Sequence, residues 1–177
     1  MLTSAASFDP STSRTWCTGW SSPWNWSTAI ELPEAGSYRV FADFKRGGRN
    51  HTLASDLAVE GPFGSLALPE PANTARIGGG YEVTLQGGAP RAGRETKLAF
   101  TVTRSGKRVA VQDYLGAKGH LVALREGDLA YLHVHPEEDG LRFETEFPTP
   151  GNYRLFLQFV TDDGRLHTAA FTQEVGR

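Results

Sequence analysis

Three of the five histidines in the chain, His120, His133 and His135, lie between Gly119 and Glu138. The last two form a His-x-His step. Side chains two residues apart on a strand share a face, and their backbones are about 6.5–7 Å apart. Two such imidazoles can converge on one ion, because metal–nitrogen bonds are about 2 Å long. Imidazole suits Cu(II) and zinc, so the spacing indicates a copper or zinc site, and the geometry of the site would select between the two metals.

The third histidine is expected to reach this step through a β-hairpin. Strand-like residues 120–124 and 130–135 flank the turn sequence Arg125–Asp128. A short turn centred on Glu126 and Gly127 pairs Leu124 near Leu129. Residues 13 apart in sequence, His120 and His133, then become neighbours across the hairpin.

Alternation along residues 130–135 indicates which way the histidines face. Ala130, Leu132 and Val134 form the more apolar row and are expected to face the core. Tyr131, His133 and His135 then face outward or into an opening at the end of the sheet. Pro136 ends the strand, because proline cannot donate a hydrogen bond to the ladder.

His167 is the fourth candidate metal ligand, since it starts another predicted strand after the turn "TDDGR". The topology that would place it beside the other three cannot be read from the sequence, and a carboxylate is an alternative further ligand. The competing interpretation is that these are solvent-facing histidines that hydrogen-bond their neighbours. His51 and His167 occupy equivalent points of a repeat, which a structural role would explain equally well.

The elements that must position these residues are all strands. Turn sequences such as "RSGK", "REGD" and "PTPG" separate short alternating runs, and no stretch has a helical period. The predicted strands are residues 81–86, 96–103, 108–111, 120–124, 130–135, 141–147, 152–159 and 166–175. This pattern predicts an all-β, immunoglobulin-like antiparallel β-sandwich.

A Gly-x-Tyr sequence at a strand start appears twice, ending at Tyr38 and at Tyr153. It resembles the tyrosine corner of immunoglobulin-like sandwiches, in which the phenol bonds to backbone a few residues upstream. From Tyr153 onward, the alternate residues Leu155, Leu157 and Phe159 are expected to face the core.

The second Gly-x-Tyr belongs to an internal repeat. "LPEAGSYRVFADF" aligns with "FPTPGNYRLFLQF", and "HTLASDLAVEG" from His51 aligns with "HTAAFTQEVG" from His167. We therefore divide the chain into an irregular segment 1–26, a partial β module 27–61, a linker 62–80 and a complete sandwich 81–177. The partial module corresponds to the C-terminal half of the sandwich and is expected to pack on it or to self-associate.

Composition excludes several classes of function. The formal net charge is -2 and no basic stripe is present, so nucleic-acid binding is not expected. No run of about 20 apolar residues predicts a membrane span. The single cysteine, Cys17, rules out an intramolecular disulfide. The N-terminal residues lack a basic and an apolar region typical of a secretory signal, which leaves a cytoplasmic location open.

Other chemistry has little support in the sequence. Ser, His and Asp are present, but no nucleophile elbow places them together, so we expect no enzyme. Cys17 lacks a strongly basic environment. The tryptophans Trp16, Trp20, Trp24 and Trp26 would be a sugar-stacking platform if they were aligned, and this keeps a carbohydrate-binding accessory domain as an alternative.

The segments "YLGAKGHLVALREGDLAYLHVHP", "FPTPGNYRLFLQF" and "HTAAF" resemble uncharacterised bacterial exported or membrane-tethered proteins with repeated immunoglobulin-like domains. These are similar to periplasmic copper carriers and heavy-metal-associated proteins. The resemblance implies an extracytoplasmic metal-binding or metal-sensing module. This chain departs from the pattern because its first module lacks the Gly-His-Leu and His-x-His-Pro sequences.

Together these features predict a β-sandwich that binds a metal ion, copper or alternatively zinc, without catalysis. The expected ligands are His120, His133 and His135, with His167 as a fourth candidate. The main alternative is an envelope protein–protein interaction module without a metal, and the carbohydrate-binding domain is the third hypothesis.

Overall fold

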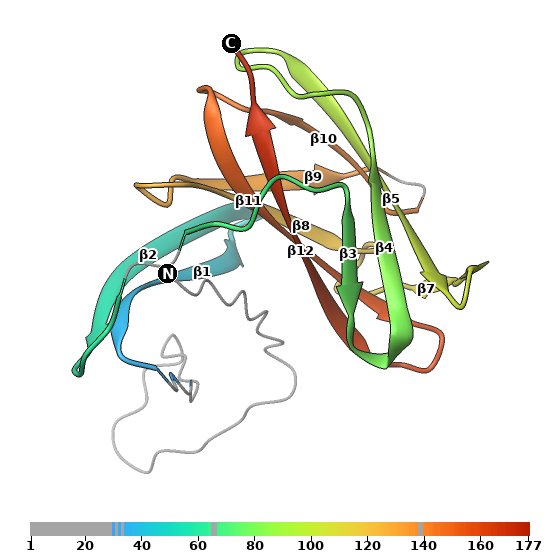
Figure 1. Ribbon diagram of the computed structural model, residues 1–177, viewed down its shortest axis with the longest axis horizontal. Coiled ribbons are helices and arrows are strands. Elements are labelled where there is room, and N and C mark those ends of the chain that lie inside the picture. The colour runs from blue at the N-terminus through green and yellow to red at the C-terminus, as the bar shows by residue number, and fades with distance from the viewer. Residues whose placement is uncertain (1–29, 31, 33, 65–66, 138–139) are drawn as a thin grey trace. The chain divides into compact units, whose positions relative to one another are not determined.

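The computed structural model describes residues 30, 32, 34–64, 67–137 and 140–177, without the side chains of residues 43, 45, 50, 133 and 135 (Figure 1). The predicted irregular segment 1–26, with Cys17 and all four tryptophans, lies outside this range. The chain divides into two compact units, Met1–Ala67 and Leu68–Arg177.

The second unit is built from strands β3 to β12. They are β3 (Thr74–Ile77), β4 (Tyr81–Gln86), β5 (Glu95–Arg104), β6 (Lys107–Arg108), β7 (Val111–Gln112), β8 (His120–Arg125), β9 (Tyr131–Pro136), β10 (Arg142–Glu146), β11 (Gly151–Thr161) and β12 (Leu166–Val175). A single 3₁₀ turn, η1 (Gly78–Gly80), joins β3 to β4. No helix in the described part of the chain is long and apolar enough to span a membrane.

The strand pairings confirm the predicted fold class, an all-β immunoglobulin-like antiparallel sandwich. Strand order is β12-β11-β8-β9-β10-β5-β4-β3, with β6 beside β5 and β7 beside β11. Strand β9 pairs with β8 along four residues and with β10 at only two. It thereby links the layer β12-β11-β8 to the layer β10-β5-β4-β3, and the two layers enclose the core (Figure 1).

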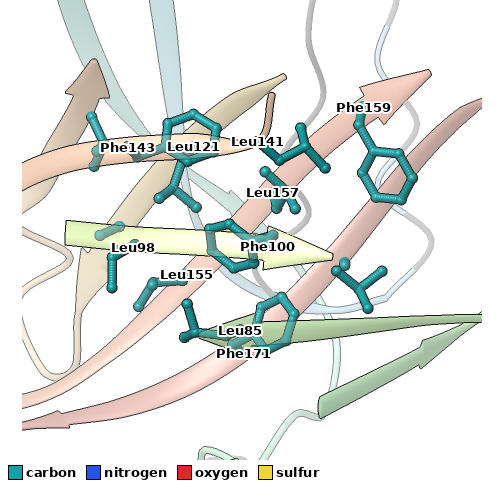
Figure 2. Packing of buried hydrophobic residues seen from close by; sticks show 14 of the residues in the cluster. Leu85, Leu98, Phe100, Leu121, Leu141, Phe143, Leu155, Leu157, Phe159 and Phe171 are labelled. Atoms are coloured by element: carbon teal, nitrogen blue, oxygen red, sulfur yellow. The ribbon is translucent and has the colours of Figure 1, made fainter. Parts of the chain in front are cut away.

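The core forms from alternate residues of both layers, as an antiparallel sheet with one buried face requires. Leu155, Leu157 and Phe159 are essentially inaccessible to solvent, which confirms the predicted inner row of β11. Figure 2 shows them with Phe100 and Phe171, whose ring centroids are 5.4 Å apart. Burying each such side chain contributes about 1.5–3 kcal/mol to the free energy of unfolding.

Two predicted boundaries differ from the structure. Residues 74–77, expected in the linker, pair with β4 from Ile77–Tyr81 to Thr74–Thr84, because η1 reverses the chain. Gly79 and Gly80 adopt φ values of 80° and 75° there, a region that favours glycine. The predicted strand 108–111 divides into β6, beside β5, and β7, beside β11, so the chain crosses between layers at this point.

Both predicted tyrosine corners are present. The Tyr153 hydroxyl donates to the Thr149 carbonyl oxygen over 3.0 Å, and the Tyr38 hydroxyl donates to the Glu34 carbonyl oxygen over 2.7 Å. In each case the acceptor is four residues upstream, so the phenol fixes the chain as it enters the strand.

The described part of the first unit consists mainly of one hairpin, β1 (Gly36–Arg46) and β2 (Arg49–Val59). Its register repeats that of β11 and β12. Gly36 pairs with Val59 as Gly151 pairs with Val175, and Phe44 pairs with His51 as Phe159 pairs with His167. The hairpin is therefore the structural counterpart of the last two strands of the sandwich.

Candidate functional site

The predicted hairpin of β8 and β9 exists, with a longer turn than expected. Leu124 pairs with Tyr131 rather than near Leu129, and Val122 pairs with His133. The register ends at the pair Leu121–Val134, and continuing it by one pair places the backbone of His120 opposite His135, two residues from the predicted neighbour His133.

The turn is longer because its polar residues stabilise a four-residue loop. Leu129 adopts φ 54° and Gly127 adopts φ 96°, and the Leu129 amide donates to the Arg125 carbonyl oxygen over 3.1 Å. Asp128 accepts the Ala130 amide and pairs with the Arg125 guanidinium. These bonds, above all the one from Arg125, hold the pKa of the Asp128 carboxyl well below its usual value.

His120 is half-buried and fixed by its surroundings. Its Nε2 lies 2.9 Å from the carbonyl oxygen of Tyr114, and the two rings meet edge to face with centroids 5.7 Å apart. A carbonyl oxygen only accepts, so Nε2 carries the proton and donates. In the neutral ring Nδ1 is then the unprotonated nitrogen. Metal-bound histidines are commonly oriented in this way, with the second ring nitrogen donating to a backbone carbonyl.

Gly119 determines how the chain enters β8 at His120. A Cβ at this position would lie 2.6 Å from Leu141 Cδ2 and 2.8 Å from the Gln158 carbonyl oxygen. The absence of a side chain lets the backbone approach β11 this closely. In this Gly-His sequence, the glycine is therefore required for the packing of the backbone on β11, and the histidine that follows it is a candidate metal ligand.

The backbones of His133 and His135 lie in β9, two residues apart, between β8 and β10. His135 pairs with Glu144 of β10. Glu144 is not among the ligands predicted from the sequence, although the alternation of charged and apolar residues in the predicted strand 141–147 indicates that its side chain faces outward. His120, His135 and Glu144 thus fall in one row across three strands. The Glu144 carboxylate is partly exposed and lies 3.6 Å from the Lys97 ammonium.

His167 lies elsewhere, on the inner face of the sheet. It pairs with the buried Phe159, and their rings stack with centroids 5.6 Å apart. The ring of Tyr81, from the opposite layer, lies 4.8 Å away. His120 pairs with Gln158, the neighbour of Phe159 on β11, and therefore belongs to the outer face. The structure does not bring His167 together with His120.

His167 is held in place by a series of hydrogen bonds that also includes Thr161 and Asp163. The Thr161 hydroxyl donates to Asp163 Oδ1 over 2.6 Å, which lowers the pKa of that carboxyl. Its oxygen then accepts from His167 Nε2 over 3.0 Å. The three residues tie together the turn between β11 and β12, a structural role.

His51 is exposed and stacks on Phe44 with ring centroids 5.4 Å apart. Among the side chains that the structure describes, which do not include those of His133 and His135, no three His, Cys, Asp or Glu residues gather closely enough to hold a metal ion. A hollow of about 420 Å³ lies beside β3 and β12. Its described lining residues include Arg154 but no histidine.

A family model described as a domain of unknown function (DUF8832) matches residues 75–177. This range begins within β3 and ends with the chain, so it coincides with the sandwich. No curated protein matches the chain.

Proposed function

The chain belongs to this family, DUF8832, and we propose that it is a non-catalytic metal-binding protein that holds copper through His120, His133 and His135. Zinc is the second metal that imidazole ligands suit. We place its function outside the cytoplasm, by analogy with the exported proteins that the sequence resembles. The observation that carries the proposal is the register of the β8–β9 hairpin.

That register supports a shared site because directly opposed residues in an antiparallel pair have Cβ atoms about 4.5–5.5 Å apart. Continued by one pair beyond Leu121–Val134, the register puts His120 opposite His135, two pairs from Val122–His133. Positions 120, 133 and 135 thus belong to two pairs that are separated by one pair and share a face of the sheet. This spacing is compatible with three imidazoles that bind one ion through metal–nitrogen bonds of about 2 Å.

The hydrogen bond from His120 to the Tyr114 carbonyl oxygen supports the same proposal. It holds the ring in one tautomer and presents Nδ1 as the free lone pair. A ligand that is oriented before the metal binds loses less conformational entropy when it does.

The ligand set favours copper(II) or zinc over copper(I). The only methionine is Met1, so no thioether cluster is available to a soft Cu(I) ion. Glu144, across from His135, is the proposed fourth ligand, a carboxylate of the kind that Cu(II) and zinc accept. Because the imidazoles must be neutral to bind, affinity should decrease below about pH 6.

Calorimetric titration of the full chain with Cu(II) and with Zn(II) tests the proposal. His120→Ala, and the pair His133→Ala with His135→Ala, should each weaken binding at least tenfold, as loss of a ligand requires. His51→Ala is the matched control, because this exposed histidine lies in the other unit. Electron paramagnetic resonance of the Cu(II) complex should show nitrogen hyperfine coupling. Absence of heat for both metals would rule the proposal out.

A further inference from the structure

One face of the β1–β2 hairpin is apolar and exposed. It contains Tyr38, Val40, Phe44, Leu53 and Leu57, which are brought together by the cross-strand pairs of the hairpin. Leu53 is 64% exposed, and Phe44 and Leu57 are each 41% exposed. A two-stranded hairpin is marginally stable by itself in water, so such a face requires a covering layer.

The equivalent face of β11 and β12 shows what covers a hairpin of this kind. Phe171 contacts Phe100 of β5, His167 contacts Tyr81 of β4, and Tyr153 contacts Phe147 just after β10, with ring centroids 4.8–5.4 Å apart. The covering layer is thus β10-β5-β4-β3, which belongs to the front half of the sandwich, β3 to β10.

Three features make the two hairpins equivalent in detail. Their registers coincide from the glycine that starts the first strand to the Phe–His pair near the turn. Both contain the tyrosine corner. Both stack a phenylalanine on the histidine across from it, at 5.4 Å in Phe44–His51 and 5.6 Å in Phe159–His167.

We propose that this face of the β1–β2 hairpin binds a partner polypeptide that supplies the front half of a second sandwich of the same kind. The partner contributes strands equivalent to β3–β10, and the hairpin closes them as β11 and β12 close the second unit. This interface is independent of the proposed metal site.

The hairpin residues define the chemistry of the partner. Val40 and Ser55 replace the larger Leu155 and Phe171, so partner side chains facing them must be larger than those of the second unit. The partner should also place an aromatic ring against His51, in the position equivalent to that of Tyr81 beside His167.

Hydrogen exchange of the full chain alone is the first test. Backbone amides of residues 36–59 should exchange at least tenfold faster than those of residues 151–175, because the apolar face of the first hairpin is exposed and that of the second is packed. Equal protection of the two hairpins would mean that the chain itself covers the face, and would overturn the proposal. Analytical ultracentrifugation then measures the oligomeric state of the chain. A dimer that Leu53→Asp converts to a monomer would identify a second copy of the chain as the occupant of this face, and would also overturn the proposal.

The second test supplies a front half in trans. The probe is the polypeptide Leu68–Thr149, which lacks β11 and β12. A synthetic peptide of residues 150–177 is the positive control, because a correctly folded probe should bind it. The probe should bind the full chain and slow exchange across residues 36–59. Leu53→Asp and Leu57→Ser should weaken this binding at least tenfold. The control Ala58→Asp, on the other face of β2, should not. The proposal would be overturned if a probe that binds the 150–177 peptide does not bind the wild-type chain. It would also be overturned if that probe binds the Leu53→Asp chain as tightly as the wild type.

Discussion

His120 and His167 project from opposite faces of the same sheet. Their partners on β11 are the adjacent residues Gln158 and Phe159, and adjacent residues of a strand point to opposite sides. His120 therefore belongs to the outer face with the backbone positions of His133 and His135, whereas His167 belongs to the core side.

His167→Ala should leave the Cu(II) affinity unchanged and lower the free energy of unfolding. The substitution removes the bond to Thr161, whose side chain is buried, and the ring contacts with Phe159 and Tyr81. We expect a loss of about 1–3 kcal/mol by urea denaturation. A tenfold weaker Cu(II) affinity in this variant would contradict the assignment of His167 to a structural role.

Glu144→Gln should weaken Cu(II) binding roughly tenfold, because it removes a carboxylate from the position across from His135. Glu146→Gln is the matched control, two residues further along β10 and paired with Glu95. Calorimetry on both variants measures the difference. Equal affinities would remove Glu144 from the ligand set and leave the three histidines.

Gly119→Ala should destabilise the sandwich by about 1–3 kcal/mol, since the added methyl group overlaps Leu141 and the Gln158 carbonyl oxygen. Gly88→Ala is the control, because a Cβ there would have no atom within 4 Å and its φ is not in the left-handed region. Thermal unfolding of both variants gives the comparison. Similar melting temperatures would show that β8 can move away from β11 at little cost.

Tyr153→Phe should lower the free energy of unfolding of the sandwich by about 1 kcal/mol, because the buried phenol loses its bond to the Thr149 carbonyl oxygen. Tyr38→Phe removes the equivalent bond from the hairpin of the first unit. It should leave the unfolding transition of the sandwich in place. Chemical denaturation monitored by circular dichroism distinguishes the two effects.

The ion pair in the β8–β9 turn should make stability depend on acid pH. The folded-state pKa of Asp128 is lowered, first by the hydrogen bond from Arg125 and then by that from the Ala130 amide. Its contribution is therefore fully present above the unfolded-state pKa of about 3.9 and is lost as the pH decreases through the lower folded-state pKa. Asp128→Asn should be less stable than the wild type at pH 7, and the difference should narrow below pH 4. A difference that is constant from pH 7 to pH 2 would contradict this assignment.

The sequence by itself determined the fold class and the positions of most strands. Two-residue alternation identifies a strand with one buried face, and Gly-rich turns separate one strand from the next, so both signals are local. The two Gly-x-Tyr corners were predictable for the same reason, because the phenol of Tyr153 reaches a carbonyl only four residues away.

Tertiary structure alone decided the register of the β8–β9 hairpin and the faces on which the histidines lie. The register depends on the backbone of Leu129, whose positive φ lengthens the turn and moves His120 from His133 to the position opposite His135. The place of His167 depends on which neighbour β12 pairs with, and the row formed with Glu144 depends on β9 joining the two layers. The pairing of β8 with β11, which places His120 and His167 on opposite faces, joins strands that have β9 and β10 between them in the chain, so no local pattern specifies it.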